Sequence, residues 1–181
     1  AATLDALAAT VPTRPAAAAV RIAQDRRREK TFFRDHGLPV GSFAIIERAD
    51  DLRDASPDLF PGILKTATLG YDGKGQARVT TREAALAAWS DCKQVPCVLE
   101  ALVPFTAEVS VLVARGADGA AAVWPVQENQ HAGGILDLTF VPARIDATLA
   151  ARAQAVATNL VTALNYVGVL CVEMFVLGDD V

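Results

Sequence analysis

The stretch from Ile63 to Gln76, ILKTATLGYDGKGQ, constrains this chain more than any other part of it. A short apolar strand that carries Lys65 runs into a loop with three glycines in six residues and a second lysine, Lys74. Glycine lets backbone N–H groups approach a bound group closely, and lysine supplies positive charge. A phosphate group fits this combination best.

Two interpretations of the stretch remain open from spacing alone. It is not a P-loop, because Gly75 is followed by Gln76 rather than by Lys-Ser/Thr, and its glycines are not spaced as G-x-G-x-x-G. Asp72-Gly73 between two apolar runs is also a common pair of hairpin turn residues. A phosphate-binding loop and a plain glycine-rich hairpin are therefore equally supported at this point.

Composition limits the partners that the chain can have. Its 181 residues are 52% hydrophobic, which is enough for one large or two small domains with a real core. The 17 basic and 21 acidic residues give a net charge of −4, and the basic residues are dispersed apart from Arg26–Arg28. This pattern argues against a nucleic-acid surface and remains compatible with a small anionic ligand.

The cysteines and the amino-terminal residues predict a cytoplasmic protein without a membrane span. Cys92, Cys97 and Cys171 contain no C-x-x-C pair, and there are only two histidines, so neither a disulfide framework nor a zinc site is indicated. We expect reduced, partly buried thiols. The alanine-rich start contains Asp5 and Arg14, which makes it unlike a signal peptide or a transmembrane helix.

Hydrophobic periodicity and breaker residues predict alternating helices and strands, as in a mixed α/β protein. Asp25 is the expected N-cap of one helix, Thr80-Thr-Arg-Glu83 is a capping-box pattern for another, and Asp146 is expected to cap a long helix with an apolar stripe. We expect 167–177 to be a strand buried on both faces. The predicted helices are 1–11, 15–24, 25–36, 49–55, 80–91 and 146–164, and the predicted strands are 40–46, 62–66, 77–80, 98–103, 107–115, 120–126, 135–140 and 167–177.

The string from Lys65 to Gln76 resembles the lid loop of the N5-carboxyaminoimidazole ribonucleotide synthetase family of ATP-grasp enzymes. Other segments resemble the same family in the same order, namely Arg21–Arg26, Gly37–Val40, Glu108–Val111, Ala114–Gly119, Glu128–His131 and Gly168–Glu173. The resemblance implies an ATP-grasp fold of class α/β (α+β), with two mixed α/β subdomains and the nucleotide bound between them. It also implies a tail and linker helix at 1–24, a small lid subdomain at 25–103 and a large subdomain at 104–181 that is incomplete at its C-terminal end.

The resemblance also implies roles for individual residues. Lys65 and Lys74 would be catalytic, and Glu173 would bind Mg²⁺. The expected ATP contacts are Arg26, Lys65, Gly70, Tyr71, Asp72, Gly73, Lys74, Gly75, Gln76, Glu100, Val103, Glu108 and His131.

Each of these roles has a simpler alternative in the chemistry of the residues. Arg26 could belong to a solvated face with Arg27 and Arg28, which we expect to be solvated in any case. Glu100 could be an ordinary strand-end carboxylate, and Glu108 a polar residue on a half-exposed strand. A lone histidine such as His131 is more often structural than catalytic, and Glu173 could reach solvent, although an ionised carboxylate in an apolar strand favours a metal ion as its partner.

For the complete enzyme, the resemblance implies ATP-dependent carboxylation of 5-aminoimidazole ribonucleotide by bicarbonate in purine biosynthesis. The products would be ADP, phosphate and N5-carboxyaminoimidazole ribonucleotide, with carboxyphosphate as the intermediate, ATP and Mg²⁺ as cofactors and a homodimer as the assembly. The family's amino-terminal domain and second metal-binding segment are expected outside these residues, so the 181 residues alone are expected to be inactive. Alternatives are another ATP-grasp carboxylase such as biotin carboxylase or the formate-dependent purine transformylase, a non-catalytic nucleotide-binding module, and a simple α/β domain.

Overall fold

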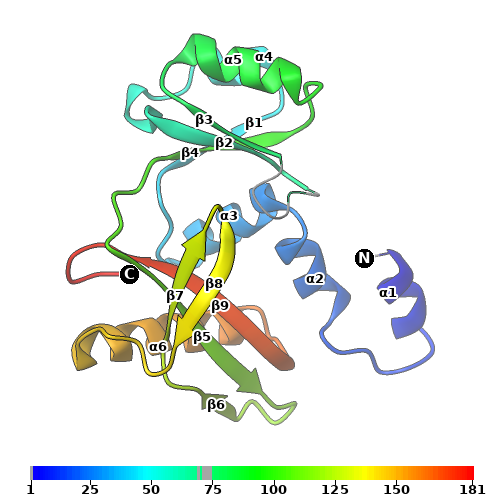
Figure 1. Ribbon diagram of the computed structural model, residues 1–181. Helices are drawn as coiled ribbons and strands as arrows, with labels where there is room; N and C mark the ends of the chain where they lie inside the picture. The colour runs from blue at the N-terminus through cyan, green and yellow to red at the C-terminus, as the bar shows by residue number, and fades with distance from the viewer. Residues whose placement is uncertain (1, 69, 71–74) are drawn as a thin grey trace. The chain divides into compact units, whose positions relative to one another are not determined.

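The computed structural model describes residues 2–68, 70 and 75–181, and the chain forms two compact units (Figure 1). The smaller unit comprises residues 22–34 and 40–103. The larger unit comprises residues 1–21, 35–39 and 104–181. Each unit has its own sheet and its own buried apolar core.

The smaller unit is an antiparallel four-stranded sheet in the order β1-β4-β2-β3. Its strands are β1 (Phe43–Ile46), β2 (Gly62–Thr66), β3 (Gln76–Val79) and β4 (Cys97–Ala101). Helices α4 (Ala49–Arg53) and α5 (Arg82–Asp91) cover one face together with the short 3₁₀ helix η1 (Pro57–Leu59), whereas α3 (Arg26–Asp35) lies on the other side (Figure 1).

Strand alternation decides which residues of this sheet join the core. Leu64 and Leu99 point toward α4 and α5 and pack with Leu52 and Trp89. Because successive side chains of a strand point to opposite faces, the neighbouring Lys65 and Glu100 point to the face on the α3 side. The core residues therefore fix the direction of the two charged side chains.

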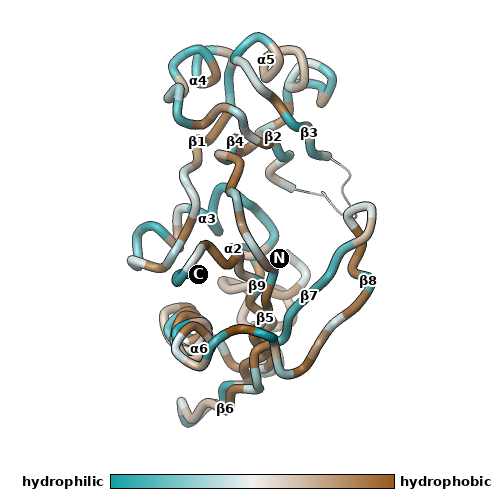
Figure 2. The backbone as a smooth tube through the Cα atoms, turned by 60° about the vertical axis from the view of Figure 1, so that its left-hand side comes forward, coloured by the Kyte–Doolittle hydropathy of each residue, from teal (hydrophilic) through white to brown (hydrophobic). Residues whose placement is uncertain are grey.

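The larger unit is built around β5 (Ala107–Arg115), which pairs with β6 and β7 along one edge and with β9 along the other. The remaining strands are β6 (Ala121–Val123), β7 (Gln127–Ala132), β8 (Ile135–Phe140) and β9 (Gly168–Val176). Helix α6 (Ala147–Ala163) packs on one face of the sheet, and α1 (Ala2–Ala8) and α2 (Ala17–Ala23) precede it in the chain. Figure 2 shows β7 mostly hydrophilic and its partner β8 mostly hydrophobic.

Several predicted elements are confirmed at their bounds. Strands 62–66, 107–115 and 135–140 begin and end as expected. Asp25 Oδ1 accepts a hydrogen bond from the backbone N–H of Arg27 at 3.0 Å, as an N-cap does. Asp146 Oδ1 likewise accepts from the N–H groups of residues 148 and 149 at 2.8 and 2.9 Å.

Other expectations need correction. The N-cap of α5 is Thr81 and not Thr80, since the Thr81 hydroxyl accepts from Ala84 N at 3.2 Å. Residues 127–132 form a separate strand, which the polar string QENQHA did not indicate. The buried stripe of α6 is formed by Leu149, Ala153, Ala157, Leu160 and Val161, whereas Val156 and Leu164 are only half-buried.

The expectation that the last strand is buried on both faces is wrong. In β9, alternate residues are exposed, with Val169 at 60% and Phe175 at 41% exposure, and Cys171 and Glu173 are exposed between them. The opposite face contributes Val172 and Val176 to the core. Cys171 is therefore not the partly buried thiol that the sequence led us to expect.

Candidate functional site

A cluster of charged side chains lies on the α3 side of the sheet in the smaller unit. The Lys30 and Lys65 ammonium groups both donate to Oε2 of Glu100, at 3.0 and 3.1 Å. The three side chains are 18%, 21% and 13% exposed, so the cluster is largely withdrawn from water. The predicted residues Lys65 and Glu100 are thus in contact, and Lys30 is a third member that the sequence did not reveal.

Helix α3 brings its basic residues to this cluster by helical periodicity. Arg26, Lys30 and Arg34 are four residues apart and share one face of the helix. The Arg26 guanidinium donates to the backbone oxygen of Thr66 at 3.0 Å, and the Arg34 guanidinium lies 5.8 Å from the centre of the Phe43 ring. Spacing of four from Arg26 was therefore the available signal for Lys30.

The pKa of Glu100 reflects the two ammonium groups. Burial alone would raise this pKa, because it disfavours the ionised form. The charges of Lys30 and Lys65 and their hydrogen bonds outweigh burial and hold the Glu100 pKa below its ordinary value. Glu100 is thus a carboxylate at neutral pH, and with two ammonium groups the triad carries one excess positive charge.

Glu29 responds in the opposite direction. Burial raises its pKa; the charges of Lys30 and Arg26 oppose this effect only partly, and the Glu100 charge adds to it. An acid with a raised folded-state pKa stabilises the fold below its unfolded pKa, and that contribution is lost as pH rises through the folded pKa. Wild-type Glu29 therefore costs stability at neutral pH.

Glu29→Gln is accordingly expected to raise the thermal midpoint at pH 7, with the gain over wild type shrinking as pH falls toward 4. Glu83→Gln is the matched control in the same unit. A backbone hydrogen bond, followed by the hydroxyl of Thr81, lowers the pKa of Glu83, so its replacement should lose stability at pH 7. Midpoints measured from pH 4 to 8 would contradict the Glu29 assignment if Glu29→Gln were destabilising at pH 7.

The other two arginines of the Arg26–Arg28 run differ from each other. Arg27 is only 26% exposed and forms ion pairs with Asp25 and Glu47, at 2.6 and 2.5 Å. The expectation that it is solvated is therefore wrong, because Arg27 ties the start of α3 to the end of β1. Arg28 is 62% exposed, as expected.

The strands on either side of the glycine-rich residues, β2 and β3, pair antiparallel, and Lys65 lies opposite Gln76. Gly75 has φ +73°, and a Cβ at this position would lie 2.6 Å from Thr66 Oγ1, so the close approach of the two strands requires glycine. Gly70 is half-buried. The predicted contacts Tyr71, Asp72, Gly73 and Lys74 lie outside the described residues, and nucleotide binding by the loop stays a prediction.

Val103 follows β4 and is half-buried in the smaller unit. The segment before it is fixed by backbone hydrogen bonds from Ala101 N to Ser42 O and from Leu102 N to Pro61 O, at 3.0 and 2.9 Å. A ligand could therefore meet a defined backbone at this position.

In the larger unit, the sheet face opposite α6 carries a polar network. Register places Ser110 opposite both Gln127 and Glu173. Asn129 Nδ2 donates to Ser110 Oγ at 3.0 Å, and Ser110 Oγ donates to Gln127 Oε1 at 3.2 Å. Thr139 Oγ1 donates to Asn129 Oδ1 at 3.1 Å, so the network crosses three strands.

The predicted contacts Glu108 and His131 meet at one end of this face. Nδ1 of His131 lies 2.8 Å from Oε2 of Glu108, and the two side chains are 26% and 29% exposed. Glu108 thereby orients the imidazole ring and leaves its Nε2 edge for another partner. The structure brings together two residues that lie 23 positions apart in the sequence, and their contact with a nucleotide stays a prediction.

Glu173 lies on the same face, opposite Ser110 in the register, and is exposed. Among residues 2–68, 70 and 75–181, no group of three or more His, Cys, Asp or Glu side chains could hold a metal ion. Mg²⁺ bound together with phosphates needs only one or two protein carboxylates and keeps several waters, so an exposed Glu173 fits a partial Mg²⁺ site.

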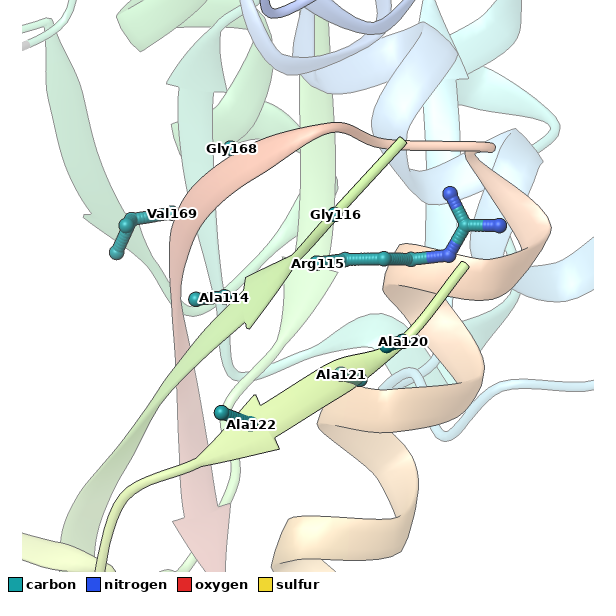
Figure 3. Close-up of a pocket in the computed structure, with 8 residues that line it drawn as sticks. All are labelled: Ala114, Arg115, Gly116, Ala120, Ala121, Ala122, Gly168 and Val169. Carbon is teal, nitrogen blue, oxygen red and sulfur yellow. The ribbon is translucent and has the colours of Figure 1, made fainter. Parts of the chain in front are cut away.

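A shallow pocket of about 440 Å³ lies at the other end of β5 (Figure 3). Small side chains from β5 and β6 line most of it, with Arg115, Gly168 and Val169 at its border. The Arg115 guanidinium donates to Tyr166 O at 2.9 Å and to Asn165 Oδ1 at 3.2 Å, beyond the end of α6. The pocket contains none of the predicted site residues. Arg115, the charged residue among those that line the pocket, thus already has hydrogen-bond partners within the protein.

In the described part of the chain, no helix is long and apolar enough to cross a membrane.

Comparison with known proteins decides the family. The model of the ATP-grasp domain family matches residues 31–181. The chain belongs to the ATP-grasp family. The chain is 41% identical over 166 residues to the N5-carboxyaminoimidazole ribonucleotide synthase of Pseudomonas aeruginosa. The aligned segment covers 91% of this chain and 46% of that relative.

Solved ATP-grasp structures agree in fold. The N5-carboxyaminoimidazole ribonucleotide synthetase of Thermus thermophilus has a TM-score of 0.88 at 39% identity and covers 98% of this chain and 48% of that one. An Aspergillus clavatus synthase in complex with ADP and 5-aminoimidazole ribonucleotide has a TM-score of 0.88 at 27% identity over 99% of this chain and 48% of that one. The chain spans about half the length of the relatives it matches, and the predicted ATP-grasp fold is confirmed.

Proposed function

We propose that this chain is the ATP-binding part of an enzyme that carboxylates 5-aminoimidazole ribonucleotide with ATP and bicarbonate, releasing ADP and phosphate. The similarity to the Pseudomonas aeruginosa synthase carries the proposal, and the charged triad of the smaller unit supports it. An excess cation beside a glycine-containing hairpin suits the polyphosphate of ATP.

The proposed nucleotide contacts include residues of the smaller unit and residues of the larger unit. From the smaller unit, Arg26 and Lys65 would neutralise phosphate charge, as phosphoryl transfer requires. From the larger unit, Glu108 and His131 would contact polar groups of the nucleotide. The 2.8 Å contact between His131 Nδ1 and Glu108 Oε2 holds the two side chains in place. The predicted contacts of residues 70–76 with the phosphates belong to the same proposal.

Mg²⁺ belongs to the same proposal. Glu173 would supply one carboxylate ligand, next to the Ser110 network. The ion, when bound, would neutralise phosphate charge during phosphoryl transfer. A cytoplasmic location, in keeping with the free thiols, and a homodimeric assembly are further parts of the proposal.

The acceptor is tested in a chimera in which residues of this chain replace the matching segment of the Pseudomonas aeruginosa synthase. ADP release is measured with Mg-ATP and bicarbonate, with and without 5-aminoimidazole ribonucleotide. The proposal expects ADP release that requires the ribonucleotide and is lost in the chimera with Lys65→Met. A folded chimera that binds ATP but does not respond to the ribonucleotide would contradict the assigned acceptor.

A further inference from the structure

Glu100 has two cationic partners, Lys30 and Lys65, although one ammonium group would be enough to neutralise its carboxylate. Lys30 and Lys65 both donate to Glu100 Oε2, at 3.0 and 3.1 Å, and all three side chains are largely buried. Lys65 with Glu100 alone would be a neutral pair. Lys30 therefore changes the net charge of these three side chains from zero to plus one, and the Glu29 carboxylate, on which the Lys30, Lys65 and Glu100 charges act, adds a negative charge to the surroundings when it is ionised.

The hydrogen-bond donors of the Lys65 ammonium group are also not all used by Glu100. An ammonium group has three donors and no acceptor. Within the described residues, Lys65 Nζ donates to Glu100 and to no other side chain. Lys30 and Lys65 share the same Glu100 oxygen. Glu100 therefore holds Lys65 in place but neutralises its charge only in part.

Lys30 itself is fixed by the helix that carries it. Arg26, one turn earlier on the same face, donates to Thr66 O, and Thr66 follows Lys65 directly in β2. The amino-terminal part of α3 is also attached by Arg26 N to Ala67 O at 2.9 Å. Helix and strand thus hold Lys30 and Lys65 on opposite sides of one carboxylate.

We propose that Lys30 is a positioning residue of the nucleotide site: it shares the Glu100 carboxylate with Lys65 and so leaves the Lys65 ammonium available to a phosphate. The role rests on the proposed ATP-binding function. Lys30 acts through Glu100 and Lys65 and makes no contact with the nucleotide. Without Lys30, Glu100 pairs with Lys65 alone and competes with the phosphate for it.

The test is calorimetric titration of the full chain with ADP and with adenosine. Lys30→Met should weaken ADP binding by about tenfold, the range expected for coupled neighbouring charges, while adenosine binding changes little. Lys30→Arg should restore most of the ADP affinity, because it returns the charge to the same carboxylate. Arg28→Met is the matched control, since it removes one charge from a 62% exposed side chain of the same helix.

A double-mutant cycle separates the positioning role from direct contact. In the Glu100→Gln background, Lys30→Met should change ADP affinity by less than about twofold, because the carboxylate through which Lys30 acts is gone. Equal losses in both backgrounds would overturn the proposal in favour of a direct contact. No loss of ADP affinity in the single variant would overturn it as well.

A ligand-free measurement separates this inference from the proposed function. Carboxyl NMR of Glu100 should show that Lys30→Met raises the Glu100 pKa while Arg28→Met does not, since Lys30 is one of the two groups that lower it. An unchanged Glu100 pKa would overturn the inference whatever the nucleotide does. If the wild-type chain binds neither ATP nor ADP, the proposed function fails and the nucleotide role of Lys30 fails with it, even when the pKa result shows that Lys30 holds Glu100.

Discussion

Lys65→Met is expected to weaken binding of Mg-ATP to this chain by roughly 10- to 150-fold, the range for loss of one hydrogen bond to a charged group. Methionine keeps the apolar stem and removes the ammonium group. Glu100 retains Lys30 as its partner at 3.0 Å, so the variant should stay folded. Titration calorimetry with Mg-ATP measures the affinity, and Trp89 fluorescence checks the fold of the same unit.

Arg53→Gln is the control for charge alone. It removes one positive charge from the smaller unit at a side chain that is 62% exposed and pairs only with Asp50 within the described residues. ATP affinity should then change less than about twofold, since exposed charges contribute little. Equal losses in the two variants would show that net charge, and not the Lys65 site, accounts for binding.

Leu99→Ala is expected to destabilise the smaller unit by about 2–5 kcal/mol, the usual cost of a Leu→Ala change in a packed core. Leu99 is fully buried in β4, directly before Glu100, and packs against the residues under α4 and α5. The truncated side chain would leave a cavity beneath the strand that carries the charged triad. Loss of the core should therefore weaken the site as well.

The two tryptophans allow this effect to be assigned to one unit. Trp89 is 6% exposed in the smaller unit, and Trp124 is 44% exposed in the larger one. Urea unfolding of Leu99→Ala in a Trp124→Phe background should shift the Trp89 transition to lower urea. Leu138→Ala, at a 46% exposed position of β8, should leave that transition unchanged, and an unchanged midpoint for Leu99→Ala would show that this core does not hold the unit together.

Sequence reasoning located the elements that have clear periodicity or end signals. The alternation of residues 107–115 predicted β5, and the apolar strand ending at Lys65 predicted β2. Asp146 before an apolar run predicted the start of α6. In these cases a local signal decides the structure, because strand period and capping chemistry act within a few residues.

The errors came from interactions between distant residues. Lys30 follows three arginines and a glutamate, and its spacing of four from Arg26 is the one local signal that sets it apart; its partner Glu100 lies 70 residues later and is brought to within 3.0 Å only by β4. Arg27 looked solvated for the same reason, although Glu47 pairs with it from the end of β1. The face of β9 that contains Glu173 was expected to be buried, but Glu173 is exposed, and the sheet register places it opposite the buried Ser110.

The central claim, that this chain binds ATP, is tested most directly by titrating the 181-residue chain with Mg-ATP in a calorimeter. Saturation at one ATP per chain is predicted, and both Lys65→Met and Glu108→Gln should weaken it. The same binding should raise the stability by about 1 kcal/mol at roughly five times Kd, which a thermal midpoint detects. A folded chain without saturable binding at millimolar ATP, or with binding that neither variant weakens, would contradict the account.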